Sequence, residues 1–186
     1  TKADVLAASS GGNGATPAAS LTELRGGAAM LARYMDESLT IPTATSIRTI
    51  SVTQMDGRRK ELKEAGHKVS FTHLIAWAIA RTAADQMPVM TNHFLEQDGK
   101  PMRADDGAVN LGIAVDTERG LLVPNIKDAQ SLDVAGVARA IGDLASRTRD
   151  RKVTPDDISG GTFTITNTGS RGTLFDTPIL NPPEVA

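Results

Sequence analysis

The sequence of 186 residues contains no cysteine, which excludes disulfides, thiolate catalysis and sulfur-ligated zinc or iron–sulfur sites. Aromatic residues make up only 3%, so a hydrophobic core must be built from Val, Ile, Leu, Ala and Met. No apolar run approaches the roughly 18 residues of a membrane span, and the N-terminus lacks the apolar core of a signal peptide. We therefore expect a cytoplasmic protein with no membrane partner.

A large excess of one charge is also missing, since the formal net charge is only -2 at pH 7. Such a balance gives no general attraction to nucleic acid, and we predict no nucleic-acid partner. The three histidines, His67, His73 and His93, share no metal-ligand spacing, so we predict no metal site. His73 precedes Trp77 by one helical turn, and that spacing favours packing between the two rings.

The length and the 40% of hydrophobic residues suit one domain with a real core. Residues 1–19 are rich in Ala, Ser, Gly and Pro, a composition typical of a flexible linker. Their glycines resemble a phosphate loop, but no Gly-Lys-Ser/Thr follows and no strand precedes them. We therefore predict a linker over 1–19 and a folded domain over 20–186.

Apolar periodicity predicts the elements of this domain. Helices are expected over 20–41, 54–65, 70–87 and 131–149, strands over 44–52, 109–116, 121–127 and 162–168, a hairpin around Asp98-Gly99, and a short helix start at 154–157. Ser20 with Glu23 has the spacing of a capping box, and Ser70 is placed to cap the third helix. Runs of helix and of strand without regular alternation indicate an α+β fold with a mixed sheet.

The last strand has the most chemical interest, because Thr162, Thr164, Thr166 and Thr168 alternate with Phe163, Ile165 and Asn167. This period of two is typical of a half-buried strand. A hydroxyl fixed on a rigid strand can donate a hydrogen bond to an oxyanion. The alternative, on the pattern alone, is a solvated threonine stripe on a sheet.

Two segments carry a resemblance: NLGIAVDTERGLLVPNIKDAQSLDVAGVARAI (110–141) and DDISGGTFTITNTGSRGTLFDTPILNPPEVA (156–186). Through them, the chain from Ser20 onward resembles the catalytic domain of the 2-oxo acid dehydrogenase acyltransferases, also called dihydrolipoamide acyltransferases. The resemblance implies a chloramphenicol acetyltransferase-like mixed β-sheet with flanking helices. We expect this fold to be incomplete at the C-terminus, because relatives run on into a histidine motif where this chain reads Pro-Glu-Val-Ala.

The family passes an acyl group between a lipoyl thioester and coenzyme A, so the resemblance implies coenzyme A as a substrate and a lipoyl group supplied by a separate domain. A histidine removes the thiol proton, and a Ser or Thr hydroxyl, here Thr166, stabilises the oxyanion. Asn167 and Gly169 belong to the same motif, as substrate contacts or as turn-formers. Arg48 is a candidate contact to coenzyme A, with an ordinary surface charge as the alternative.

The family's histidine motif, Asp-His-Arg-x-x-Asp-Gly, does not occur in this sequence. His93 does not fit it, since Asn92 precedes it and Asp98 lies five residues on instead of four. We therefore expect the general base outside these 186 residues, which alone should be inactive.

The resemblance also implies self-association in a trimer-based homo-oligomer, with dehydrogenase or decarboxylase and lipoamide dehydrogenase components as partners in the tricarboxylic acid cycle. Two alternatives stay open at this point. One is a catalytically silent assembly scaffold that keeps the fold, and the other is a coenzyme A-dependent transferase with a non-lipoyl acceptor. The sequence does not indicate which acyl group is carried.

Overall fold

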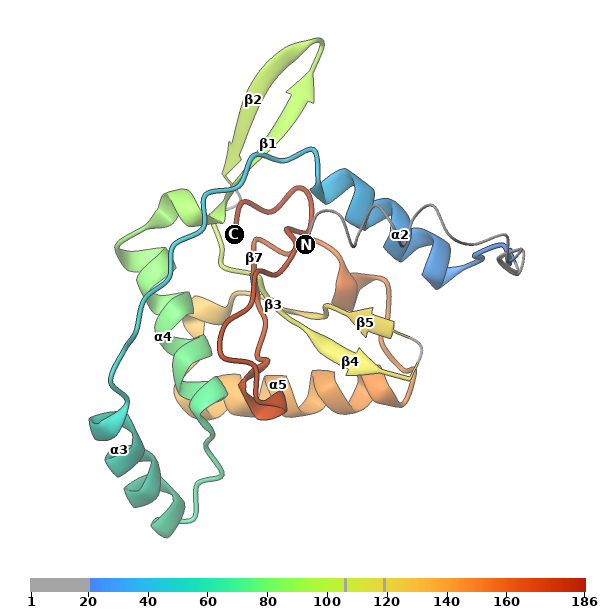
Figure 1. The fold of residues 1–186 in the computed structure, drawn as a ribbon. Coiled ribbons are helices and arrows are strands. Elements are labelled where there is room, and N and C mark those ends of the chain that lie inside the picture. Colours follow the sequence, from blue (N-terminus) through green and yellow to red (C-terminus); the bar gives the residue numbers. More distant parts are fainter. Residues whose placement is uncertain (1–20, 106, 119) are drawn as a thin grey trace, which may run out of the picture.

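The centre of the fold is a three-stranded sheet, seen in a computed structural model that describes residues 21–105, 107–118 and 120–186 (Figure 1). Strand β3 (Leu111–Ile113) lies in the middle, with β6 (Asn125–Ile126) antiparallel on one side and β7 (Phe163–Ile165) parallel on the other. The α+β class and the mixed sheet are therefore confirmed. The predicted linker, 1–19, lies outside the described residues.

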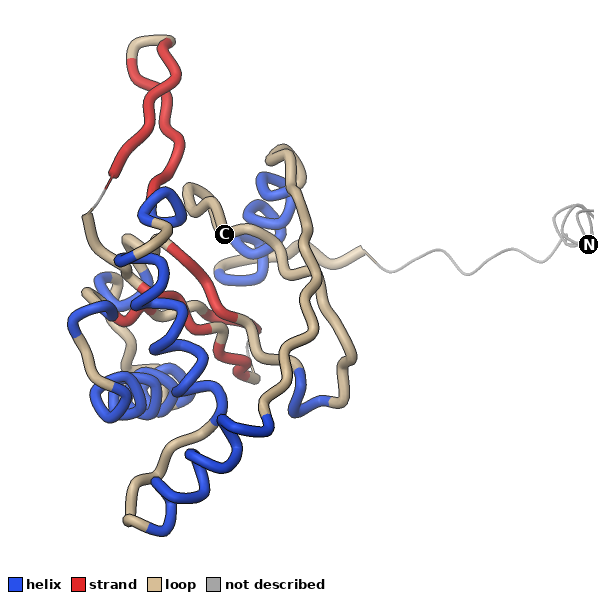
Figure 2. The backbone as a smooth tube through the Cα atoms, turned by 90° about the vertical axis from the view of Figure 1, so that its left-hand side faces the viewer, coloured by secondary structure: helices blue, strands red, loops and turns tan. Residues whose placement is uncertain are grey.

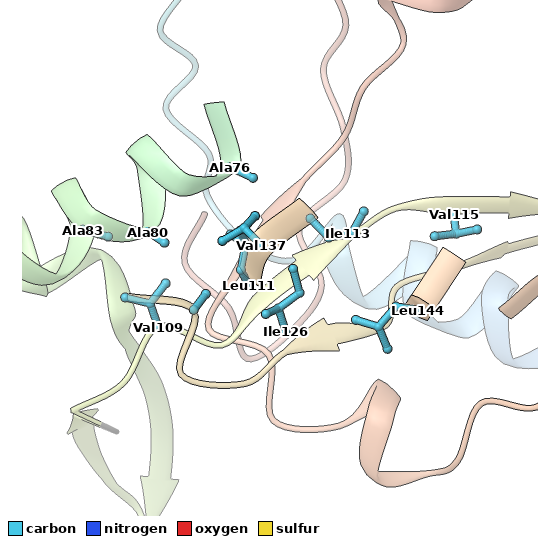
Figure 3. Close-up of a cluster of buried hydrophobic side chains, with 11 residues drawn as sticks. Ala76, Ala80, Ala83, Val109, Leu111, Ile113, Val115, Ile126, Val137 and Leu144 are labelled. Atoms are coloured by element: carbon cyan, nitrogen blue, oxygen red, sulfur yellow. The ribbon is translucent and has the colours of Figure 1, made fainter. Parts of the chain in front are cut away.

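Two long helices, α4 (Phe71–Asp85) and α5 (Val134–Arg149), supply the other side of the core (Figure 3). Small side chains on α4 let it approach the sheet closely, and α5 contributes larger ones. The buried hydrophobic residues are Ala76, Ala80, Ala83, Val109, Leu111, Ile113, Val115, Ile126, Ala129, Val137 and Leu144. None of them is aromatic, as the composition predicts. Trp77 lies at the edge of this core, and its Nε1 donates to the carbonyl of Leu132 over 3.2 Å rather than packing on His73 alone.

The start of each core helix is fixed by a side chain. Ser70 Oγ accepts from the backbone N–H of His73, and the imidazole of His73 in turn accepts from the N–H of Ser70, which completes a capping box. The predicted cap by Ser70 is confirmed. Helix α5 begins at Val134 instead of near Ser131, because Asp133 caps it and a 3-10 turn, η2 (Ala129–Ser131), precedes it.

Three elements stand away from the core (Figures 1 and 2). They are α2 (Gly27–Ser38), α3 (Thr53–Glu64), and a hairpin of β1 (Asn92–Gln97) and β2 (Lys100–Asp105) that follows the 3-10 turn η1 (Pro88–Thr91). The hairpin and α3 are confirmed predictions. Asp98 and Gly99 have positive φ values of 53° and 70°, the left-handed pair that a tight two-residue hairpin turn requires.

Two predictions near the N-terminus are wrong. The first helix begins at Gly27 rather than at 20, because the carboxylate of Glu23 pairs with Arg25 and Gly26 interrupts the helix with a φ of 56°. The strand expected over 44–52 is absent, and residues 42–54 are all exposed. This segment runs across the molecule from α2 to α3 without a partner strand (Figures 1 and 2), and an alternating pattern alone does not provide one.

The strands predicted over 109–116 and 121–127 are each divided in two. The parts next to the connecting turn form β4 (Val115–Thr117) and β5 (Gly120–Leu122), which pair as a separate antiparallel hairpin. The parts farther from that turn form β3 and β6, which pair in the main sheet. The division falls at Pro124, which has no N–H for a ladder and accepts instead from the N–H of Ile113 over 2.9 Å.

The short turn before β7 is tied to α5 by charge. It forms the 3-10 helix η3 (Asp156–Ile158), where we expected a helix start at 154–157. Arg147 of α5 holds the carboxylate of Asp157 with two N–H···O bonds of 2.6 and 2.9 Å, and this guanidinium keeps the pKa of Asp157 well below its ordinary range. The link fixes the approach of the chain to β7, the strand that carries the threonines.

Candidate active site

The strand predicted over 162–168 is shorter in the structure, since β7 contains only Thr164 of the four threonines. They do not form a solvated stripe, because Thr162 is buried and Thr164, Thr166 and Thr168 are half-buried. Thr162 is 2% exposed, and its hydroxyl accepts from the N–H of Asn110 over 2.9 Å. The hydroxyl of Thr164 donates to the carboxylate of Glu184 over 2.5 Å. The hydroxyls of Thr162 and Thr164 are therefore used in hydrogen bonds within the fold, and Thr166 is the remaining candidate for a catalytic hydroxyl.

Thr166 is the first residue beyond β7, just after the ladder bond from Ala114 N–H to the carbonyl of Ile165 (3.0 Å). Among the described residues, nothing forms a hydrogen bond with its hydroxyl. An O–H group at the end of a strand, half-buried and without a partner, is free to donate to an oxygen that carries developing charge. Its placement agrees with the role that the resemblance implies.

Asn167 and Gly169, next to Thr166, form a turn. Asn167 Oδ1 accepts from the N–H of Gly169 over 3.1 Å, and this is the Asx turn that short polar side chains favour. The other end of the amide, Nδ2, donates to Thr72 Oγ1 on α4 over 2.8 Å. Both residues are exposed, so their turn-forming role is observed and their contact with substrate stays a prediction.

Arg48 lies elsewhere, in the exposed segment between α2 and α3. Its guanidinium donates to the carbonyl of the preceding residue, Ile47, over 2.9 Å. Within the described parts of the chain it makes no ion pair and no hydrogen bond with β7 or with the turn after it. The structure brings Thr166, Asn167 and Gly169 together and does not bring Arg48 to them.

Glu184 places a buried carboxyl beside β7, and no motif or spacing in the sequence predicts it. Glu184 is 7% exposed, and its Oε1 lies 2.4 Å from the place where a Cβ on Gly161 would stand. Asn125 Oδ1 lies 2.6 Å from the same place and has no hydrogen-bond donor. Burial raises the pKa of Glu184 to about 7, although the bond from Thr164 opposes this shift. Both oxygens thus face the space that a side chain at position 161 would fill.

Glycine is required at position 112, where β3 faces the polar cluster of Thr164, Glu184 and Asn125. A Cβ on Gly112 would stand 2.7 Å from Thr164 Oγ1 and 2.9 Å from a methyl group of Val123. Gly112 and Thr164 are paired residues of the parallel strands β3 and β7. Because Gly112 has no side chain, β3 and β7 can pair while Thr164 and its polar neighbours pack against β3.

The histidines do not complete the site. His73 is bound into the capping box of α4, where burial lowers the pKa of its imidazole and where its Nδ1 acts as an acceptor. His93 lies on the projecting hairpin, in β1, and His67 follows α3. None of the three bonds to Thr166 in the described structure. Over the same residues, no three His, Asp or Glu side chains gather as metal ligands.

Two cavities occur elsewhere on the surface. One, of about 700 Å³, lies between the β4–β5 hairpin and the C-terminal end of α5. The other, of about 530 Å³, lies at the base of the β1–β2 hairpin and is mainly apolar. Thr166 lines neither of them. Of the helices in residues 21–186 that the structure describes, none has the length and apolar character to cross a bilayer.

Comparisons of sequence give close relatives. The multifunctional 2-oxoglutarate metabolism enzyme of Mycobacterium sp. (strain JLS) is 41% identical over 167 residues, which are 84% of this chain and 13% of that protein. The dihydrolipoyllysine-residue acetyltransferase component of the pyruvate dehydrogenase complex of Mycobacterium bovis is 46% identical over 145 residues, 76% of this chain and 26% of that protein. The chain thus spans only a small part of these relatives.

Comparisons of structure agree. A truncated catalytic core of the 2-oxoacid dehydrogenase multienzyme complex from Thermoplasma acidophilum has a TM-score of 0.82 at 32% identity, covering 90% of this chain and 77% of that one. The dihydrolipoamide acetyltransferase of Azotobacter vinelandii has a TM-score of 0.78 at 28% identity, covering 89% and 70%. Residues 17–186 also match the family described as 2-oxoacid dehydrogenases acyltransferase (catalytic domain). The chain therefore belongs to this family of acyltransferase catalytic domains.

Proposed function

We propose that this domain transfers an acyl group between a lipoyl thioester and coenzyme A within a 2-oxo acid dehydrogenase complex. The observation that carries the proposal is the Thr166 hydroxyl, which is half-buried, lies at the end of β7 and has no hydrogen-bond partner among the described residues. Membership of the acyltransferase family supports the reaction class. The Azotobacter relative, whose catalytic mechanism has been probed at a serine, a histidine and an asparagine, supports a hydroxyl in this role.

In the proposed mechanism, the thiolate of coenzyme A attacks the thioester carbonyl of the acylated lipoyl group. The carbon–sulfur bond forms, and the carbonyl oxygen becomes an oxyanion that accepts the O–H of Thr166. Collapse of the tetrahedral intermediate breaks the bond to the lipoyl sulfur, which leaves as a thiolate and takes up the proton that coenzyme A lost. Thr166 needs no change of charge in these steps.

The proton of the coenzyme A thiol passes through a general base. Since His67, His73 and His93 are not bonded to Thr166, we expect the base from another polypeptide or from further sequence, and we expect the 186 residues alone to be inactive. The lipoyl group would come from a separate domain. Arg48 remains a proposed contact to coenzyme A, reached only if a neighbouring copy brings its segment toward β7.

A trimer-based homo-oligomer is proposed for the assembly, because solved relatives include the cubic core of a pyruvate dehydrogenase multienzyme complex. A cleft that forms between copies would also explain why Thr166 lines neither of the two cavities described above. The dehydrogenase or decarboxylase and lipoamide dehydrogenase components would be its partners, in the cytoplasm and in the tricarboxylic acid cycle.

The test is Thr166→Ala in the full-length protein, with transfer from acylated dihydrolipoamide to coenzyme A as the readout. Loss of one oxyanion donor should lower kcat by about 100-fold to 1,000-fold. Thr166→Ser keeps the hydroxyl and should retain most of the rate, and Thr82→Ala, on the exposed side of α4, is the matched control. An unchanged rate in Thr166→Ala would remove Thr166 from the mechanism, whereas the absence of transfer in the native full-length protein would favour the silent scaffold.

A further inference from the structure

The direction of the Thr166 hydroxyl is not set by the sheet. The last ladder bond of β7 ends at Ile165, so the backbone of Thr166 lies outside the strand. Its hydroxyl has no partner of its own among the described residues. Positioning of a reacting group matters strongly, because a displacement of about 1 Å can cost on the order of 100-fold in rate. Something beyond the strand must therefore hold this residue.

The side chain of the next residue, Asn167, connects it to a distant helix. Its Nδ2 donates to Thr72 Oγ1 over 2.8 Å, across 95 positions of sequence. Its Oδ1 accepts from Gly169 N–H over 3.1 Å, which fixes the amide from the other side. Because both ends of the amide are used inside the protein, the chain direction after Thr166 is determined at two points.

The helix that receives this bond is rigidly placed. Thr72 is the second residue of α4, inside the capping box made by Ser70 and His73. Farther along the same helix, Ala76 and Ala80 are fully buried in the core. The bond from Asn167 thus ties the turn after β7 to one of the most constrained parts of the molecule.

We propose that Asn167 and Thr72 are positioning residues, which together hold the Thr166 hydroxyl in its productive direction; for Asn167 this role takes the place of the predicted contact with substrate. This inference rests on the proposed role of Thr166 and assigns a function to a threonine on another element. The bond between the two side chains acts on catalysis through Thr166. Its loss should lower kcat and leave KM nearly unchanged, because the substrate contacts remain.

The experiment compares Thr72→Val, Thr72→Ser and Asn167→Ala in the full-length protein, with Thr82→Val as the matched control on the exposed side of α4. We expect Thr72→Val and Asn167→Ala each to lower kcat by about 10-fold to 100-fold, with KM changed less than about twofold. Thr72→Ser keeps the acceptor and should restore the rate. The double variant should be no slower than Asn167→Ala, because that variant already removes the bond to Thr72 together with the bond from Gly169.

The same substitutions in a Thr166→Ala background separate the two hypotheses. If the native full-length protein transfers no acyl group, the proposed function fails; if it does and Thr166→Ala alone has no effect, the roles of Thr166 and of its positioning residues fail. The positioning role fails, while the function stands, if Thr72→Val slows the Thr166→Ala variant further. It also fails if, in the native background, Thr72→Val raises KM alone or changes neither kcat nor KM. If Thr72→Val does not fold, Asn167→Ala, on the exposed turn, decides by the same criteria.

Discussion

A missing side chain at Gly161 makes room for two acceptor oxygens, Glu184 Oε1 and Asn125 Oδ1. A carboxylate is costly in a buried place, because it loses its hydration. Burial accordingly raises the pKa of Glu184 to about 7, so this carboxyl is mainly protonated below that pH. This residue therefore couples folding to pH, and the sign of the coupling follows from the direction of the shift.

Glu184 binds a proton more readily in the folded chain than in the unfolded chain, where its pKa is near 4.5. The free energy of unfolding should therefore fall as pH rises from about 4.5 to about 7 and stay lower above it, by roughly 3 kcal/mol at most. Glu184→Gln removes the titration and keeps a neutral side chain of nearly the same size, so this variant should be the more stable one at pH 8. Denaturation followed by the fluorescence of Trp77, at pH 5 and pH 8, measures the difference.

Glu96→Gln, at an exposed position of β1, is the control for that measurement and should leave the pH dependence unchanged. An equal decline between pH 5 and pH 8 in Glu184→Gln and the native chain would show that another group is responsible.

Single residues differ in how well the sequence predicts them. Thr166 is proposed from the sequence because its motif resembles that of a known family; the alternation places it on a strand, whereas β7 ends one residue before it. Glu184 and Thr72 could not be predicted, since each acts through one contact with a residue far along the chain and neither lies in a local pattern. Arg48 is predicted to contact coenzyme A because of its charge, and charge does not indicate which surface a side chain reaches.

At the scale of elements, the capping box of α4 has a measurable consequence. Ser70→Ala removes the acceptor for the N–H of His73, and loss of such a cap typically costs about 1 kcal/mol. The expected result is a lower denaturation midpoint with an unchanged slope. Ser70→Thr keeps the hydroxyl and should lose only a small part of that stability, whereas equal losses in both variants would point to packing rather than to the cap.

The elements that sequence predicted well are those whose signals are local. Helices α3, α4 and α5 have their periodicity and their end residues in one stretch, and the β1–β2 hairpin has its turn at Asp98-Gly99. The failures are the strand over 44–52 and the undivided strands around Pro124. Strands depend on partners elsewhere in the chain, so a local pattern does not decide whether they pair.

At the scale of the molecule, a large amount of apolar surface faces outward. Leu174 is 93% exposed and Phe175 66%, in a segment after β7 without helix or strand, and Leu39 is 83% exposed beside α2. Large apolar side chains that stay this exposed in a single copy are candidates for burial in an association between proteins. This exposure supports the proposed homo-oligomer.

We therefore predict that replacing Leu174 and Phe175 by Glu lowers the sedimentation coefficient of the full-length protein to that of a smaller assembly. Charged side chains in a buried interface are costly unless paired, so the association should weaken by at least tenfold. Ile158→Glu, at a half-exposed position in η3, should leave the assembly intact. An assembly of unchanged size in the double variant would place the contact surface elsewhere.

The parallel pairing of β3 with β7 also constrains the order in which the sheet can fold. Strand β7 joins its neighbour only after α5 has been synthesised and laid back across the sheet, since the two strands are separated by that whole crossover. The turn that carries Thr166 can therefore take its place beside α4 only after the whole crossover from β3 through α5 to β7 has formed, and a nascent chain that stops before β7 lacks the hydroxyl proposed to act.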